Sequence, residues 1–99
     1  MEKSNPSYPL AEIQAQMQSV PDMNLTLVAR TGIRAAGMAQ LDALGVVQAL
    51  TRKDFYKSMT THADHRVWQD VYHGQWGDLS LYIKFQRVGE YFVVSFKEL

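Results

Sequence analysis

The sequence predicts an α+β protein in which short helices pack on one face of a small antiparallel β-sheet. Two observations support this prediction. Apolar residues recur at helical spacing in the first half of the chain, whereas the last third alternates apolar and polar residues, as strands do. Ninety-nine residues, 46% of them hydrophobic, suffice for one core, so we expect a single domain over residues 1–99.

Three short helices are expected before residue 51. The first has apolar residues three or four positions apart from Leu10 to Val20, and Pro21 ends it. The segment "MNLTLV" (23–28) is expected to be extended. A second helix then ends near Gly37, and a third covers residues 41–50.

The segment "TRKDFYKSM" (51–59) resembles a helix start. Thr51 and Asp54 have the spacing of a capping box, with aspartate in place of glutamate. We therefore expect a helical turn here, with Lys57 on it.

Three strands in a meander are expected from residue 65 onward. They are "HRVWQDVY" (65–72), "DLSLYIKFQRV" (78–88) and "EYFVVSFKE" (90–98), joined by the glycine-containing turns "HGQWG" and "VGE". Trp76 lies in the first turn, where it either packs back or is exposed to stack on a base or dock a partner. The sheet leaves an unpaired edge for a partner chain unless "MNLTLV" covers it.

Alternation decides which side chains share a face of this sheet. In the middle strand, Leu79, Leu81, Ile83 and Phe85 form the apolar set, which leaves Tyr82 on the other face. The first strand is ambiguous, because either its valines or its aromatic residues could face the core. If the valines do, Gln69 faces the core and reaches Tyr82 only through a twist or bulge.

Composition excludes several kinds of chemistry. The chain has no cysteine, so it has no disulfide, no thiolate nucleophile and no cysteine-ligated zinc. His62, Asp64 and His65 are close in sequence but lack a recognised ligand spacing. We expect no metal site and no cofactor. No apolar segment resembles a signal peptide or a membrane span, so we expect a cytoplasmic protein.

The net charge of zero predicts no long-range field that would attract a polyanion. Binding to nucleic acid would therefore need a local patch. We expect RNA to be bound by the basic residues Arg52, Lys53, Arg66 and Lys84.

Four motifs in order resemble one known family. "DFYKSMT" (54–60), "WQDVY" (68–72), "LYIK" (81–84) and "VVSFKE" (93–98) are similar to motifs of the motility quorum-sensing regulator (MqsR) toxins. The resemblance implies a RelE-like, microbial-RNase-like fold. It also implies metal-independent cleavage of single-stranded mRNA at GC-centred sites, commonly GCU, without the ribosome. The implied partner is a zinc-binding, DNA-binding antitoxin of the MqsA type.

The same resemblance implies that Lys57, Gln69 and Tyr82 are catalytic, with Lys97 as a candidate auxiliary group. Metal-free RNA cleavage needs a base for the 2′-hydroxyl, a cation for the phosphorane and an acid for the 5′-oxygen. Lys57 suits the cation, Gln69 a positioning role and Tyr82 the acid.

The base remains unassigned among these three residues. His65 is a candidate for it, or for orienting Tyr82, although the favoured interpretation is a structural role in capping the start of the strand. The alternative function is a catalytically idle binding module that modulates DNA binding by its antitoxin.

Overall fold

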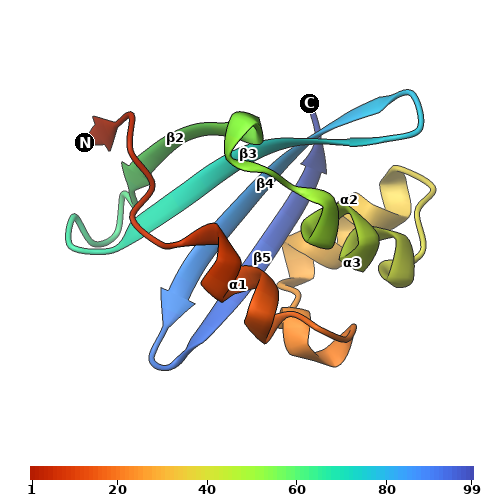
Figure 1. Ribbon diagram of the computed structural model, residues 1–99, viewed down its shortest axis with the longest axis horizontal. Coiled ribbons are helices and arrows are strands. Elements are labelled where there is room, and N and C mark those ends of the chain that lie inside the picture. The colour runs from red at the N-terminus through yellow and green to blue at the C-terminus, as the bar shows by residue number, and fades with distance from the viewer.

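The computed structural model describes residues 1–99 and has the predicted α+β architecture (Figure 1). Its antiparallel sheet has five strands in sequence order: β1 (Glu2–Lys3), β2 (Phe55–Thr60), β3 (Trp68–Trp76), β4 (Leu79–Val88) and β5 (Tyr91–Glu98). The other elements lie between β1 and β2: α1 (Leu10–Gln16), η1 (Pro21–Met23), α2 (Leu27–Ala35), α3 (Gln40–Ala49) and η2 (Arg52–Asp54).

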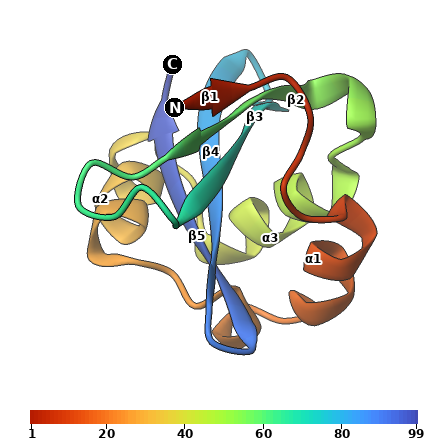
Figure 2. The ribbon, with the colours of Figure 1, turned by 90° about the vertical axis from the view of Figure 1, so that its left-hand side faces the viewer.

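All three α-helices contribute to one core of 17 buried residues. Figure 2 shows α1 and α3 on one side of the sheet, while α2 packs along β5. Thr26 caps α2 by accepting a hydrogen bond from the amide of Ala29 at 3.0 Å. A Cβ atom at Gly32 would overlap the backbone carbonyl of Phe96, so glycine is what allows this close approach.

The segment "MNLTLV" is extended only in part. Leu25 forms a parallel bridge to Val94, and the amide of Thr26 donates to the carbonyl of Val94 at 3.4 Å. Helix α2 begins at Leu27, the next residue. The edge of β5 is therefore partly covered, as the sequence allowed.

The meander of β3, β4 and β5 is confirmed, but two further strands extend it. The capping interaction at Thr51 is present, because its amide donates to Asp54 Oδ2 at 2.7 Å. The turn nevertheless ends at Asp54, and β2 begins at Phe55. The prediction that Lys57 lies on a helical turn is therefore wrong. Pairing of β2 with β3 overrides the local helix signal.

The aromatic residues of β3, not its valines, face the core. Tyr72 is fully buried and packs edge-on against Phe55 and Phe85, with ring centroids 5.4 and 5.7 Å away. On the same face, the buried carboxylate of Asp70 accepts hydrogen bonds from the amides of Ser7 and Tyr8, both at 2.9 Å. Gln69 therefore lies on the opposite face without any rearrangement.

The first predicted turn is shorter than expected, since β3 continues to Trp76 and the chain turns at Gly77, where φ is +56°. Trp76 is partly buried and packs against the core. The second turn, at Gly89, is confirmed.

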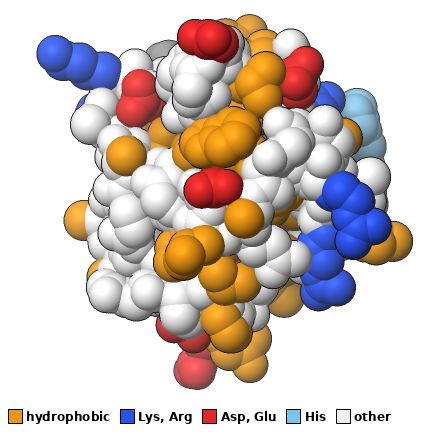
Figure 3. Space-filling model, turned by 90° about the vertical axis from the view of Figure 1, so that its right-hand side faces the viewer, with side chains coloured by type: hydrophobic (Ala, Val, Ile, Leu, Met, Phe, Trp, Pro, Cys, Tyr) orange, Lys and Arg blue, Asp and Glu red, His pale blue; other side chains and the backbone are white.

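The surface formed by the helices is mixed in character. Leu27 and Val28 of α2 and Leu41 of α3 are exposed apolar residues. Seen from the side that carries these helices, hydrophobic side chains are interrupted by polar ones (Figure 3). None of the helices has both the length and the apolar character needed to cross a membrane.

Candidate functional site

The predicted catalytic residues share the outer face of the sheet, which we define as the face opposite the core. Residues directly opposite each other on neighbouring strands point to the same face. Lys57 pairs with Val71, Val71 with Lys84, and Gln69 with Gln86. Tyr82 pairs with His73 on one side and with Lys97 on the other. The structure thus brings Lys57, Gln69, Tyr82, Lys84 and Lys97 onto one face.

An irregularity in β2 adds an aromatic residue to this face. The register with β3 shifts between Phe55 and Lys57, which leaves Tyr56 as the extra residue of a bulge. Its ring stacks on His73, with centroids 4.4 Å apart and planes inclined by 25°. The bulge therefore presents both Tyr56 and Lys57 on the outer face.

These side chains form a row across the sheet, which we call the central row: Lys57, Tyr56, His73, Tyr82 and Lys97. Lys57 Nζ lies 5.5 Å from the Tyr56 ring centroid. The His73 and Tyr82 rings are 6.1 Å apart, and Lys97 Nζ lies 4.9 Å from the Tyr82 ring centroid. Three aromatic rings are therefore flanked by a cation at each end.

Lys57 is held by an acidic residue at the start of the chain. Its Nζ donates to Glu2 Oε2 at 2.7 Å, and β1 holds Glu2 beside β2. This hydrogen bond is the main reason that the pKa of Lys57 is raised above its ordinary value and that of Glu2 is lowered. The charges of Tyr82 and Tyr56 also raise the pKa of Lys57. Lys57 is therefore a protonated cation at neutral pH.

Gln69 lies at a distance from the central row. It is four residues before His73 on β3, which corresponds to about 13 Å along the strand. Its Nε2 donates to Gln86 Oε1 at 3.0 Å, which fixes its direction. Gln69 and Lys84 also line a hollow of about 220 Å³, whose lining includes Thr26 and Val28. Gln69 therefore lies too far along the sheet to contact the same small group as Tyr82.

The other predicted residues lie outside the outer face. His65 and Arg66 are exposed in the loop of residues 61–67 between β2 and β3. Arg66 Nε pairs with Asp64 Oδ1 at 3.1 Å, which lowers the pKa of Asp64. Tyr82 is opposite the second half of β3, so the structure does not bring His65 beside it.

Two more predicted RNA-binding residues, Arg52 and Lys53, are exposed on η2. The Arg52 guanidinium lies 4.8 Å from the ring centroid of Phe55, whose opposite residue is the core residue Tyr72. Of the four residues expected to bind RNA, only Lys84 lies on a strand of the sheet, and it is on the outer face.

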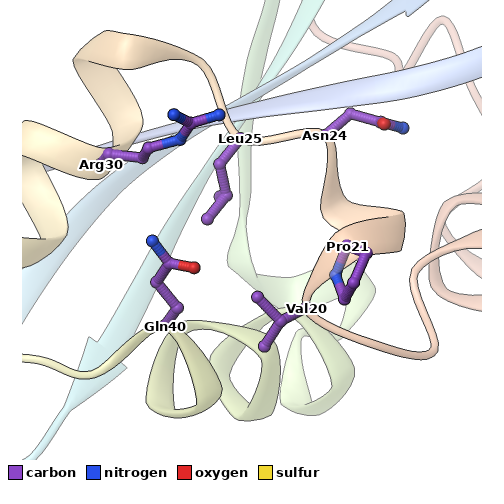
Figure 4. Close-up of a pocket in the computed structure, with 6 residues that line it drawn as sticks. All are labelled: Val20, Pro21, Asn24, Leu25, Arg30 and Gln40. Atoms are coloured by element: carbon purple, nitrogen blue, oxygen red, sulfur yellow. The ribbon is translucent and has the colours of Figure 1, made fainter.

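A hollow larger than the one beside Gln69 lies elsewhere. It has a volume of about 680 Å³ and is lined by residues from η1, α2, α3 and the segment before α2. Figure 4 shows Val20, Leu25 and Gln40 turned toward one another across it, with Arg30 beside them. It contains none of the predicted catalytic residues and no group suited to proton transfer near neutral pH, so we place the candidate site on the outer face of the sheet.

Comparison with known proteins identifies the family. The family model described as "Motility quorum-sensing regulator, toxin of MqsA" matches residues 5–98. The chain belongs to the MqsR toxin family. It is also 33% identical, over 98 residues and 99% of both chains, to the mRNA interferase toxin MqsR of Escherichia coli (strain K12). The matched range includes β2 to β5 and hence every strand of the central row.

Sequence reasoning missed four residues that shape the site in this MqsR-family chain. They are Glu2, Tyr56, His73 and Gln86. A signal for His73 was available, because it continues the alternation of Gln69 and Val71 on one face. No sequence signal indicated the bulge at Tyr56 or the return of Glu2 to Lys57.

Proposed function

We propose that this member of the MqsR family is an mRNA interferase. It cleaves single-stranded mRNA at GC-centred sites such as GCU without a metal ion and thereby inhibits translation in the cytoplasm. One observation carries the proposal: Lys57 and Tyr82 lie on the same outer face of the sheet, in one row of side chains that ends in a second lysine, Lys97.

The arrangement supports cleavage through the ribose 2′-hydroxyl. Attack by this hydroxyl on the phosphate creates a phosphorane with added negative charge. Lys57 carries the positive charge that stabilises it, after exchanging Glu2 for a phosphate oxygen. Tyr82 donates its proton to the leaving 5′-oxygen, and Lys97 stabilises the phenolate that remains.

The side chains of the site also support the metal-independent part of the proposal. The central row offers amine, phenol and imidazole groups, which hold and transfer protons. Gln69 contributes amide hydrogen bonds to a neighbouring nucleotide, with its direction set by Gln86.

The partner in this proposal is an antitoxin of the MqsA type, which binds zinc and DNA. The family description names a toxin of MqsA. The chain acts on DNA only indirectly, through that antitoxin.

The test is cleavage of a labelled single-stranded RNA that contains one GCU, by the purified chain in EDTA. A second RNA differs only in that triplet, and sequencing of the products locates the cut. We expect cleavage at the GCU in the first RNA alone. Cleavage without preference would refute the specificity, and rescue only by added metal would refute metal independence. No cleavage under any condition would favour the binding-module alternative.

Lys57→Ala is the matched variant. It should lower the rate on the order of 10²–10³, as loss of one group that stabilises a developing oxyanion does. Arg34→Ala removes the same charge from an exposed position near the end of α2 and serves as the control. Equal rates for the two variants, with unchanged thermal unfolding, would remove Lys57 from the mechanism.

A further inference from the structure

We propose that His73 is the general base that takes the proton from the attacking 2′-hydroxyl. The inference rests on the proposed function. It supplies the general base, a role that none of Lys57, Gln69 and Tyr82 fills. Lys57 is protonated and bound to Glu2. Glutamine cannot transfer protons, and the hydroxyl of Tyr82 is required as the acid.

Geometry puts His73 at the centre of the site. It is the direct cross-strand partner of Tyr82, and the two rings are 6.1 Å apart. The attacking oxygen approaches phosphorus from the side opposite to the leaving oxygen, so a base and an acid must stand on either side of one phosphate, as two separate neighbouring rings can. A phosphate above the His73 and Tyr82 rings would lie within the central row, which has a lysine at each end.

The surroundings of His73 fix its ring and leave its nitrogens free. Stacking on Tyr56 at 4.4 Å orients the ring plane. His73 is partly exposed, and no protein group forms a hydrogen bond with either ring nitrogen. A ring nitrogen is therefore available to accept the substrate proton.

The other two histidines do not have this position. His62 and His65 are exposed in the loop of residues 61–67, which precedes β3. His73 is in the second half of β3, opposite Tyr82. The chemistry that the sequence suggested for His65 is therefore assigned to His73.

The charged and titratable groups around His73 come from every neighbouring strand. Across the outer face they are Glu2 on β1, Tyr56 and Lys57 on β2, Tyr82 and Lys84 on β4, and Lys97 on β5. Glu2 is engaged by Lys57, so no free carboxylate among these groups competes for the role of base. His73 is the one among them whose residue type titrates near neutrality.

The proposed cleavage step accounts for each bond formed or broken and for each proton transferred. The 2′-oxygen forms a bond to phosphorus as its proton passes to a nitrogen of His73. The bond from phosphorus to the 5′-oxygen breaks, and that oxygen takes the proton of Tyr82. The products are a 2′,3′-cyclic phosphate and a 5′-hydroxyl, with His73 protonated and Tyr82 deprotonated. Proton exchange with water restores both residues.

The experiment compares the pH dependence of cleavage between pH 5.5 and 8.5 for the parent, His73→Gln and His65→Gln. The parent rate should rise through about pH 6.5, the ordinary histidine value. His73→Gln should lose this rise and be slower on the order of 10²–10⁴, which is the usual contribution of a general base. His65→Gln should keep both the rise and the rate.

Two further variants separate catalysis from packing. His73→Phe retains a ring to stack on Tyr56 but cannot accept a proton, so it should be as slow as His73→Gln. His73→Ala should be partly rescued by added imidazole, which a purely structural role would not permit. Thermal unfolding confirms that each variant folds.

Failure of the inference can be told from failure of the proposed function. If the parent cleaves RNA with a flat pH profile, or if His73→Phe keeps the parent rate, His73 is not the base and the interferase function stands. If the parent does not cleave RNA, the function and the inference both fail.

Discussion

Replacing Tyr72 by phenylalanine tests how a buried hydroxyl in the core beneath the site affects the stability of the fold and its dependence on pH. The Tyr72 side chain is fully buried and its hydroxyl has no hydrogen-bond partner. Burial is the main cause that raises its pKa from 10.0 to about 12. Between these values the unfolded chain releases the phenolic proton while the folded chain keeps it, so the free energy of unfolding falls as pH rises.

The size of this effect follows from the shift. Two pKa units correspond to about 2.7 kcal/mol of stability, lost by about pH 12. Tyr72→Phe should remove this part of the alkaline loss. At pH 7 the variant should be as stable as the parent or more stable by about 1 kcal/mol, because it removes a buried hydroxyl without a partner.

Urea unfolding between pH 7 and 11.5 measures both effects. Tyr91→Phe is the control, since Tyr91 is 62% exposed. Burial also raises the pKa of Tyr8, so Tyr72→Phe should reduce the alkaline loss without abolishing it. If the parent and Tyr72→Phe lose the same stability as the pH rises, Tyr72 is not a source of the alkaline loss. If Tyr72→Phe is less stable than the parent at pH 7, the hydroxyl of Tyr72 is hydrogen-bonded.

Three further predictions concern other parts of the molecule. Gly32→Ala should destabilise the fold by about 1–3 kcal/mol in urea unfolding, because its Cβ would push α2 away from Phe96; unchanged stability would contradict the close approach. Tyr82→Phe should slow cleavage of ordinary RNA on the order of 10²–10⁴ but spare a substrate with a good 5′-leaving group. Equal loss on both substrates would argue against Tyr82 as the acid. Glu2→Gln should tighten RNA binding a few-fold at low salt by freeing Lys57, since exposed ion pairs are weak; weaker binding would mean that Glu2 positions Lys57.

The sequence predicted the parts of the fold that have a clear periodicity. Residues 79–86 alternate apolar and polar side chains, residues 91–98 keep this period in a weaker form, and the structure confirms β4 and β5 there. Helical spacing likewise located α1 and α3, although α1 ends at Gln16, earlier than expected. Strand β2 was missed because the capping signal at Thr51 is real but governs only one short turn. Its strand character comes from pairing with β3, which is a long-range effect.

The sequence was enough to name the residues of the candidate site, but not to predict how their side chains are arranged on the sheet. The motifs identify Lys57, Gln69 and Tyr82, and their functional roles stay predictions. The face of β3 could not be chosen from its pattern, because valines and aromatic residues alternate there. Val71 and Tyr72 are equally buried, but only Tyr72 packs within the core cluster, against Phe55 and Phe85, and this decides the choice. His73 was assigned to a turn, since the glycine that follows it suggested that the strand had ended.

Gly74, the glycine after His73, explains how β3 continues past His73 and places this residue in the site. Gly74 faces the core, where a Cβ atom would lie 2.6 Å from Ile83 Cδ1 and 3.0 Å from Val46 Cγ1. Glycine at this position therefore lets α3 pack against β3 without ending the strand. As the strand continues, His73 points to the outer face, directly opposite Tyr82. Gly74→Ala should then weaken packing on the core side and shift His73 on the other side. A loss of stability without any change in the pH dependence of cleavage would show that the two faces of β3 act independently.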